Sequence, residues 1–155
     1  MALEIERKFL VKDARWRALI DESRKMRQGY LTQAGKASVR IRCDAKRGWI
    51  NVKSAQLGVS RDEYEYEIPL ADAEQMLDQL ALKPLIEKTR HFVRIGPHMW
   101  EIDEFEGQNA GLIVAEIELG DVGEFFERPA WIGAEVTDDA RYYNNNLARN
   151  PYTSW

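Results

Sequence analysis

Charged and apolar residues alternate with period two in seven short stretches of the chain, and the charges cluster by sign. Because successive side chains of a β-strand point to opposite faces, each stretch predicts a strand with one charged and one apolar face. The resulting sheet should carry acidic and basic strands on the same face. The stretches are Glu4-Ile5-Glu6-Arg7-Lys8, Val39-Arg40-Ile41-Arg42, Ile50-Asn51-Val52-Lys53, Glu63-Tyr64-Glu65-Tyr66-Glu67, Lys88-Thr89-Arg90, Glu101-Ile102-Asp103 and Glu116-Ile117-Glu118.

Turn residues separate these stretches and predict that most of the strands are joined as hairpins. One hairpin should turn at Lys46-Arg47-Gly48 and another at Gly96-Pro97. We expect eight strands, at about residues 2–11, 30–32, 38–44, 47–54, 60–69, 85–95, 98–106 and 112–120.

Apolar residues at helical spacing predict three helices. The first should begin at Asp13 and end before Gly29, and the second should begin near Asp72 with an apolar face. The third should cover Thr137 to Ala148, where a run of three asparagines is poor helix sequence and leaves its length open.

Helices need apolar surface to pack on, and the apolar faces of the strands supply it. The charged faces must then lie inside the sheet. This arrangement predicts an α+β fold built on an eight-stranded antiparallel closed β-barrel, a tunnel with a charged lumen and helices packed outside. The 155 residues suit one domain that spans residues 1–155.

Composition removes several classes of function. The net charge of −4 gives no overall basic signal for a nucleic-acid duplex. No apolar run approaches the ~20 residues that a membrane helix needs. A charge at the fourth residue argues against a signal peptide at the start of the chain, so we expect a cytoplasmic protein. The single cysteine, Cys43, shares the side of its strand with apolar residues and is expected to be a small buried hydrophobe.

A polar face turned to water is the ordinary interpretation of any one alternating strand. Like charges two residues apart on one face lie about 7 Å from each other and repel, which argues against that interpretation for the whole set. Acidic strands suit a metal and basic strands suit a polyanion. The predicted lumen carries six basic and nine acidic side chains. The basic ones are Lys8, Arg40, Arg42, Lys53, Lys88 and Arg90, and the acidic ones are Glu4, Glu6, Glu63, Glu65, Glu67, Glu101, Asp103, Glu116 and Glu118.

Ligands that are all oxygen favour Mg²⁺ or Mn²⁺. A zinc site is not expected, because His91 falls on the apolar side of its strand and His98 falls in a turn. The sequence shows no nucleophile constellation, P-loop or glycine-rich dinucleotide turn. Attack by a metal-activated water is therefore the expected chemistry.

The order of these motifs resembles the CYTH, or triphosphate tunnel metalloenzyme, superfamily, and in particular its short bacterial inorganic triphosphatases. The first stretch matches the ExExK signature, and the similarity covers essentially the whole chain. It continues through Gly29-Tyr30-Leu31, Val39 to Arg42, Val52-Lys53, Arg61 to Ile68, Lys88 to Arg90, Trp100 to Phe105, Ala115 to Leu119 and the ending from Val136 to Ala148.

The resemblance implies roles for individual residues. The implied metal ligands are Glu4, Glu6, Glu116 and Glu118, with Asp103 as a further candidate. The implied phosphate-binding residues are Lys8, Arg40, Arg42, Lys53, Lys88 and Arg90, and Glu63 and Glu65 are expected to orient them. The implied catalytic residues are Glu6, Lys88 and Tyr30. Lys88 either helps to deprotonate the attacking water or only holds phosphate, and Tyr30 either reaches the lumen or belongs to the core.

The first functional hypothesis is metal-dependent hydrolysis of inorganic tripolyphosphate to pyrophosphate and phosphate. It is favoured because the chain has short loops and no recognisable pocket for an organic group. The alternatives are a thiamine- or nucleoside-triphosphatase, a class IV adenylate cyclase, and a polyphosphate-binding protein without activity. The expected partner is a small anionic triphosphate, and family resemblance makes a homodimer plausible.

Overall fold

The computed structural model describes residues 3–32, 35–55 and 59–155. This part of the chain forms nine strands, all paired antiparallel, and two α-helices. The strands are β1 (Leu3–Val11), β2 (Glu22–Thr32), β3 (Ala37–Cys43), β4 (Gly48–Ser54), β5 (Ser60–Ile68), β6 (Ile86–Ile95), β7 (His98–Phe105), β8 (Ile113–Glu118) and β9 (Ile132–Glu135).

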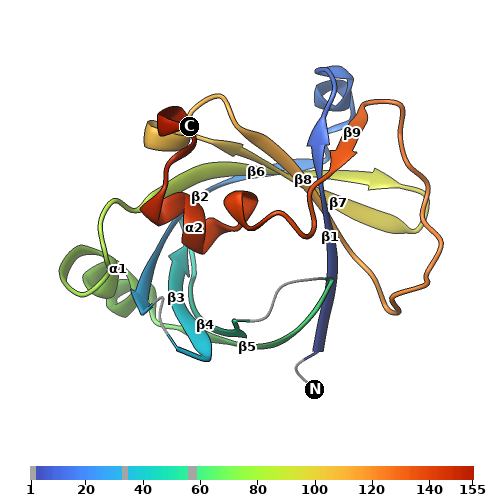
Figure 1. Cartoon of the computed structure of the whole chain (residues 1–155). Coiled ribbons are helices and arrows are strands. Elements are labelled where there is room, and N and C mark those ends of the chain that lie inside the picture. Colours follow the sequence, from blue (N-terminus) through green and yellow to red (C-terminus); the bar gives the residue numbers. More distant parts are fainter. Residues whose placement is uncertain (1–2, 33–34, 56–58) are drawn as a thin grey trace.

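Eight of the strands close into a ring, as the sequence predicted. Each pairs with the next in the order β1-β5-β4-β3-β2-β6-β7-β8, and β8 returns to β1 (Figure 1). The closing strand β1 pairs with β5 through Leu3–Ile5 and with β8 through Glu6–Leu10. The ninth strand, β9, adds to the far end of β1. The ring turns charged residues of β1, β3, β4, β5, β6, β7 and β8 toward its interior.

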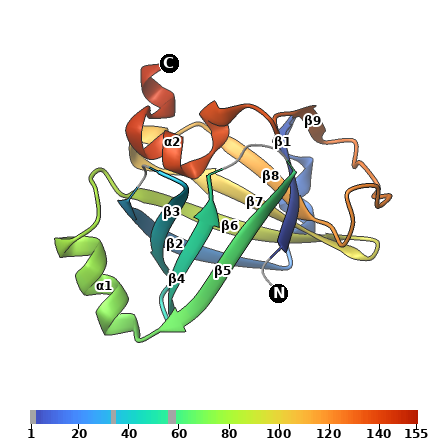
Figure 2. The ribbon, with the colours of Figure 1, turned by 60° about the horizontal axis from the view of Figure 1, so that its bottom comes forward.

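The apolar sides of the strands form two outer cores. Helix α1 (Leu70–Gln79) packs on one side of the ring, where Ala73 and Leu77 bury Ile41 and Cys43 of β3 (Figures 1 and 2). Gly48 of β4 permits this close contact, because a Cβ there would lie 2.5 Å from the Cβ of Ala73. Cys43 is buried, which confirms its predicted place in the core.

The second outer core covers β1, β6, β7 and β8, and the extended segment between β8 and β9 packs over it together with Trp16. Phe126 and Trp131 of this segment pack with Phe9 and Trp100 of the strands. Phe9 and Trp100 meet edge to face, with ring centroids 5.6 Å apart. This packing holds the segment between β8 and β9 against the ring.

The helix predicted between Asp13 and Gly29 is wrong. A short 3₁₀ helix at Arg15–Leu19 buries Trp16, and the long strand β2 follows from Glu22. Charged and polar residues lie on both faces of β2, so its sequence lacks a clear period of two. Its pairing with both β3 and β6 overrides the local pattern.

The tail also differs from the predicted helix of residues 137–148. Helix α2 covers only Asn144–Arg149, and a 3₁₀ turn at Ala140–Tyr142 precedes it. Leu147 packs with Ile86, Phe105 and Val114, whose side chains lie at one end of the ring interior. Helix α2 therefore lies across one end of the ring instead of on its outside (Figure 1). Across the described residues, we find no helix with the length and apolar character needed to span a membrane.

Candidate active site

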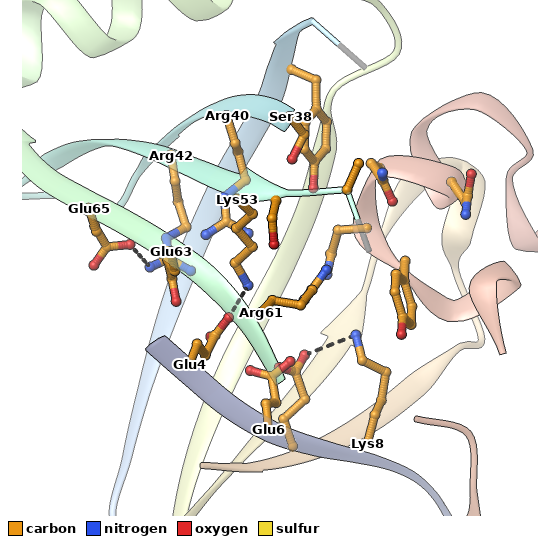
Figure 3. A pocket seen from close by; sticks show the side chains of 18 of the residues that line it. Glu4, Glu6, Lys8, Ser38, Arg40, Arg42, Lys53, Arg61, Glu63 and Glu65 are labelled. Carbon is orange, nitrogen blue, oxygen red and sulfur yellow. Dashed lines mark hydrogen bonds and ion pairs between the residues drawn. The ribbon is translucent and has the colours of Figure 1, made fainter. Parts of the chain in front are cut away.

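The inward faces of the ring surround a cavity of about 640 Å³. Among the described residues that line it, seven are basic and seven are acidic. Figure 3 shows that the side chains of β1 and those of β3 and β4 enter this cavity from opposite sides. The charged residues are Lys8, Arg40, Arg42, Lys53, Arg61, Arg90, Arg149, Glu4, Glu6, Glu63, Glu65, Glu101, Glu116 and Glu118.

The structure brings together most of the residues that the sequence singled out. Those at the cavity wall are Glu4, Glu6, Lys8, Tyr30, Arg40, Arg42, Lys53, Glu63, Glu65, Arg90, Glu101, Glu116 and Glu118. Lys88 and Asp103 do not line the cavity, because both side chains are fully buried behind it. Glu67 points away from the site, where its carboxylate lies 3.9 Å from Arg47.

The carboxylates of β1 and β8 form the acidic part of the site. Strand register places Glu6 opposite Glu118, and Glu116 opposite Lys8. Burial and the charge of Glu116 raise the pKa of Glu6 well above its ordinary value. Burial and the neighbouring carboxylates, Glu4 first, also raise the pKa of Glu118. These raised pKa values show that the clustered carboxylates disfavour one another's ionised form.

This carboxylate group fits a hard divalent cation in its chemistry, since every donor is an oxygen and the like charges repel. Within the described residues, no three acidic, histidine or cysteine side chains already converge as a metal site. Glu4 instead contacts Lys53 at 2.9 Å, and Glu116 lies 3.7 Å from Lys8. A cation would thus be held by rotation of these side chains away from the two lysines.

Arginines of β3 form the basic part of the site. The Nε atoms of Arg40 and Arg42 are buried and have no hydrogen-bond partner. Burial, followed by the charges of Arg40 and Arg90, lowers the pKa of Arg42 to about 10, although Glu65 lies 3.2 Å away. Buried donors without acceptors are costly, so this wall is arranged to receive an anion.

A buried cluster lies behind the wall on β6 and β7. Asp103 accepts hydrogen bonds from Lys88 Nζ at 2.7 Å and from Arg90 Nε at 2.8 Å. Arg90 also reaches Glu101 at 3.0 Å and contributes to the cavity wall. Burial lowers the pKa of Lys88 to about 7, against the attraction of Asp103. Arg90 and Lys88 hold the pKa of Asp103 below its ordinary value in spite of its burial.

The wall also contains residues that the sequence did not single out. Arg61 has the same parity along β5 as Glu63 and Glu65, so the alternation could have identified it. Tyr143, Arg149 and the three asparagines of α2 carried no such signal, because another element brings them to the ring. The full additional set is Leu3, Ser38, Ser54, Ala55, Arg61, Tyr143, Asn144, Asn145, Asn146 and Arg149.

Comparison with known proteins places this cavity in a family. A family model for the CYTH domain matches residues 2–150. An inorganic triphosphatase of Acetivibrio thermocellus is 45% identical over 155 residues, which are 100% of this chain and 99% of that protein. An inorganic triphosphatase of Nitrosomonas europaea is 36% identical over 152 residues, which are 94% of this chain and 96% of that protein.

A solved structure gives the same result. The crystal structure of an inorganic triphosphatase superposes with a TM-score of 0.66 at 34% identity, covering 96% of this chain and 95% of the other. The matches extend over essentially the whole length of both partners, so the fold is common to them. This chain belongs to the CYTH domain family.

Proposed function

We propose that this protein hydrolyses inorganic tripolyphosphate to pyrophosphate and phosphate with the help of Mg²⁺ or Mn²⁺. The observation that carries the proposal is the pairing, in one cavity, of mutually repelling carboxylates with arginines whose Nε atoms lack acceptors. A divalent cation would satisfy the first group and a phosphate chain the second. The inorganic triphosphatases to which the chain is similar support the same activity.

The walls of the cavity favour an inorganic substrate. Among its described lining residues, the side chains without a charge or amide group are Leu3, Ala55, Ser38, Ser54 and the tyrosines Tyr30 and Tyr143. Tyr30 is 5% exposed and Tyr143 is 6% exposed, so neither offers a broad ring face for stacking a base. The remaining surface consists of groups that bind charge. A nucleoside or thiamine moiety would find little apolar surface there.

Glu4, Glu6, Glu116 and Glu118 are the residues proposed to hold the metal. When bound, such a cation polarises phosphoryl oxygens and makes water a better nucleophile at neutral pH. Asp103 was a further candidate ligand. Its carboxylate would have to leave Lys88 and Arg90 to reach a cation in the cavity.

The cations of the wall are proposed to hold the phosphate chain. Arg40 and Arg42 supply planar donors, while Lys8 and Lys53 supply point charges from the other strands. The chemistry needs little more than positioning and neutralisation of charge, which is general for phosphoryl transfer.

The acidic residues of β5 are proposed to orient this wall. Asn51 donates to both Glu63 and Glu65, and Glu65 also contacts Arg42. These contacts hold the Arg42 guanidinium at the edge of the cavity without enclosing it.

Tyr30 and Lys88 are proposed catalytic residues, and the geometry allows two roles for Lys88. Tyr30 lines the cavity, so its hydroxyl is on the side where substrate would bind. Lys88 lies behind the wall, with its ammonium on Asp103 and 3.5 Å from the side-chain oxygen of Asn144. As a base, Lys88 would take a proton at Nζ. As a holder of phosphate, it would first have to leave Asp103 and reach the cavity.

The test is release of phosphate from three substrates, namely tripolyphosphate, ATP and thiamine triphosphate. Each is assayed with Mg²⁺, with Mn²⁺ and with a chelator. We expect rapid metal-dependent release from tripolyphosphate and much slower release from the other two. Faster turnover of an organic triphosphate, or formation of cyclic AMP from ATP, would replace this proposal with one of the alternatives. Tight binding of tripolyphosphate without turnover would indicate a binding protein.

A further inference from the structure

The ring of Tyr143 lies against two cations of the cavity. Lys8 Nζ is 5.2 Å from the centroid of this ring, and Arg61 Cζ is 5.0 Å from it. Lys8 belongs to β1, Arg61 belongs to β5, and Tyr143 directly precedes α2. All three residues line the cavity. One aromatic side chain from the tail thus contacts two basic side chains from neighbouring strands of the ring.

A ring face holds a cation in a different way from a carboxylate. The π face attracts the cation through its quadrupole but adds no net charge. A carboxylate that pairs with a lysine or arginine cancels part of the positive electrostatic potential of that side chain. A phosphate group must then compete with the carboxylate for the cation. Lys8 already has one weak contact of that kind, with Glu116 at 3.7 Å. The Tyr143 ring supports Lys8 and Arg61 without weakening their attraction for an anion.

The position of the ring is itself fixed. Tyr143 is 6% exposed, and its hydroxyl donates to the backbone oxygen of Thr137 at 2.6 Å. The Thr137 hydroxyl oxygen accepts a hydrogen bond from the backbone N–H of Lys8 at 3.0 Å. These two bonds connect the tyrosine to the strand that carries Lys8. The ring therefore keeps its distance from the lysine when the tail moves slightly.

We propose that Tyr143 is a positioning residue that holds Lys8 and Arg61 in the orientation that binds the phosphate chain. This inference rests on the proposed function, because it assigns a substrate to the cations. Tyr143 acts through the two cations and does not need to touch the reacting atoms. The competing view is that Tyr143 only fills space at the base of α2.

The test compares two substitutions at this position. Tyr143→Phe keeps the ring face and loses the bond to Thr137, whereas Tyr143→Leu loses both. Calorimetry with tripolyphosphate in the presence of a chelator measures binding without turnover. We expect Tyr143→Leu to weaken binding about tenfold and Tyr143→Phe to restore it to within about twofold of the natural protein. The Michaelis constant for tripolyphosphate should rise with the dissociation constant, while kcat falls less.

Tyr142→Leu is the matched control. It removes an aromatic ring from the same segment, but the Tyr142 ring packs against Trp155 at 5.2 Å instead of against Lys8 or Arg61. We expect it to lower the melting temperature and to leave tripolyphosphate binding within about twofold. Melting curves of all variants separate loss of folding from loss of binding.

A double-mutant cycle decides between positioning and space filling. If Tyr143 acts through Arg61, Tyr143→Leu should weaken binding by a smaller factor when Arg61→Gln is already present. Equal losses in both backgrounds, repeated with Lys8→Gln, would overturn the proposal, as would a Phe variant as impaired as the Leu variant.

These outcomes are distinct from those of the function test. Suppose that the protein binds tripolyphosphate and the double-mutant cycle shows coupling between Tyr143 and the cations, but no cleavage occurs. The role of Tyr143 would then stand, and the proposed activity would be wrong. A protein that cleaves tripolyphosphate with identical affinity in the Leu and Phe variants would retain the activity and lose the role. Absence of any tripolyphosphate binding by the natural protein would overturn both.

Discussion

Two strands of the ring carry basic residues at the same spacing and on the same inward face, yet their surroundings differ. On β6, Lys88 and Arg90 both bind the fully buried carboxylate of Asp103. On β3, the Nε atoms of Arg40 and Arg42 are buried without an acceptor. Asp103 binds both members of the first pair, whereas in the second pair Arg42 contacts the partly exposed Glu65 and both Nε atoms lack an acceptor.

The neighbouring strands explain this difference. Arg90 lies directly opposite Asp103 in the register of β6 and β7. In contrast, Arg40 lies between Tyr30 of β2 and Asn51 of β4, both uncharged. The residue across the strand pair therefore decides whether an inward arginine stabilises the fold or remains available for an anion.

The largest expected effect comes from the acidic side of the cavity. Glu6→Gln should reduce metal-dependent turnover of tripolyphosphate by about 10³-fold or more, because it removes a carboxylate from the proposed metal site. Unlike loss of Asp103, it should keep or raise the melting temperature without metal, since burial and the charge of Glu116 disfavour the ionised form of Glu6. Phosphate release and melting curves measure both effects.

Glu67→Gln is the control for that experiment. Glu67 has the charged parity of β5 but is 58% exposed and lies 3.9 Å from Arg47 outside the cavity. Its substitution should leave turnover as it was. Activity retained in Glu6→Gln would show that this carboxylate is not essential for holding metal.

The next largest effect tests the buried cluster. Asp103→Asn should lower the free energy of unfolding by about 3–5 kcal/mol, because it leaves Lys88 and Arg90 as uncompensated buried charges. Chemical denaturation measures this loss. If Asp103→Asn unfolds at nearly the same denaturant concentration as the natural protein, the cluster of Lys88, Arg90 and Asp103 does not stabilise the fold.

Substitution of an arginine of β3 should affect binding more than stability, which is the opposite of what we expect for Asp103. Arg40→Gln should weaken tripolyphosphate binding by about 10- to 100-fold, the range expected for lost hydrogen bonds to a charged group. Stability should stay level or rise, because Arg42 loses a like-charged neighbour. Arg47→Gln is the matched control, since Arg47 is 64% exposed outside the cavity. A marked loss of stability in Arg40→Gln, with tripolyphosphate binding retained, would show that Arg40 stabilises the fold and does not bind the anion.

The smallest effect concerns Glu65, the carboxylate nearest to Arg42. Its side chain is 35% exposed and lies 3.2 Å from the guanidinium. Glu65→Gln should change the free energy of unfolding by less than about 1 kcal/mol, as is usual for a partly exposed ion pair. Denaturation of this variant beside Asp103→Asn compares the two carboxylates directly. Equal losses would show that the β3 arginine is neutralised as fully as the β6 pair.

The alternating stretches were sufficient to predict the ring and most of its cavity. They were sufficient because side-chain parity in a strand decides which face a residue occupies, and the ring turns one face inward. The parity of a residue along a strand does not show how deeply its side chain is buried. Lys88 and Asp103 have the inward parity of the other candidates, but both side chains are fully buried and do not line the cavity.

The failures of prediction have related causes. Only the end of strand β2, at residues 30–32, was predicted as a strand, and the part before Gly29 was predicted as a helix. The residues of β2 are polar on both faces, so pairing with β3 and β6 determines its conformation. Strand β9 has four residues and was missed. Tyr143 and Arg149 reach the cavity from the tail, and their position depends on how Leu147 packs into the end of the ring. Local sequence does not encode such docking.

Phosphorus NMR of tripolyphosphate incubated with the protein tests the central claim most directly. With Mg²⁺ present, the account predicts loss of the tripolyphosphate signals and the appearance of pyrophosphate and phosphate in equal amounts. Addition of a chelator should stop the reaction, and renewed Mg²⁺ should restart it. Signals that stay unchanged with folded protein and excess Mg²⁺, or hydrolysis that continues in chelator, would contradict it.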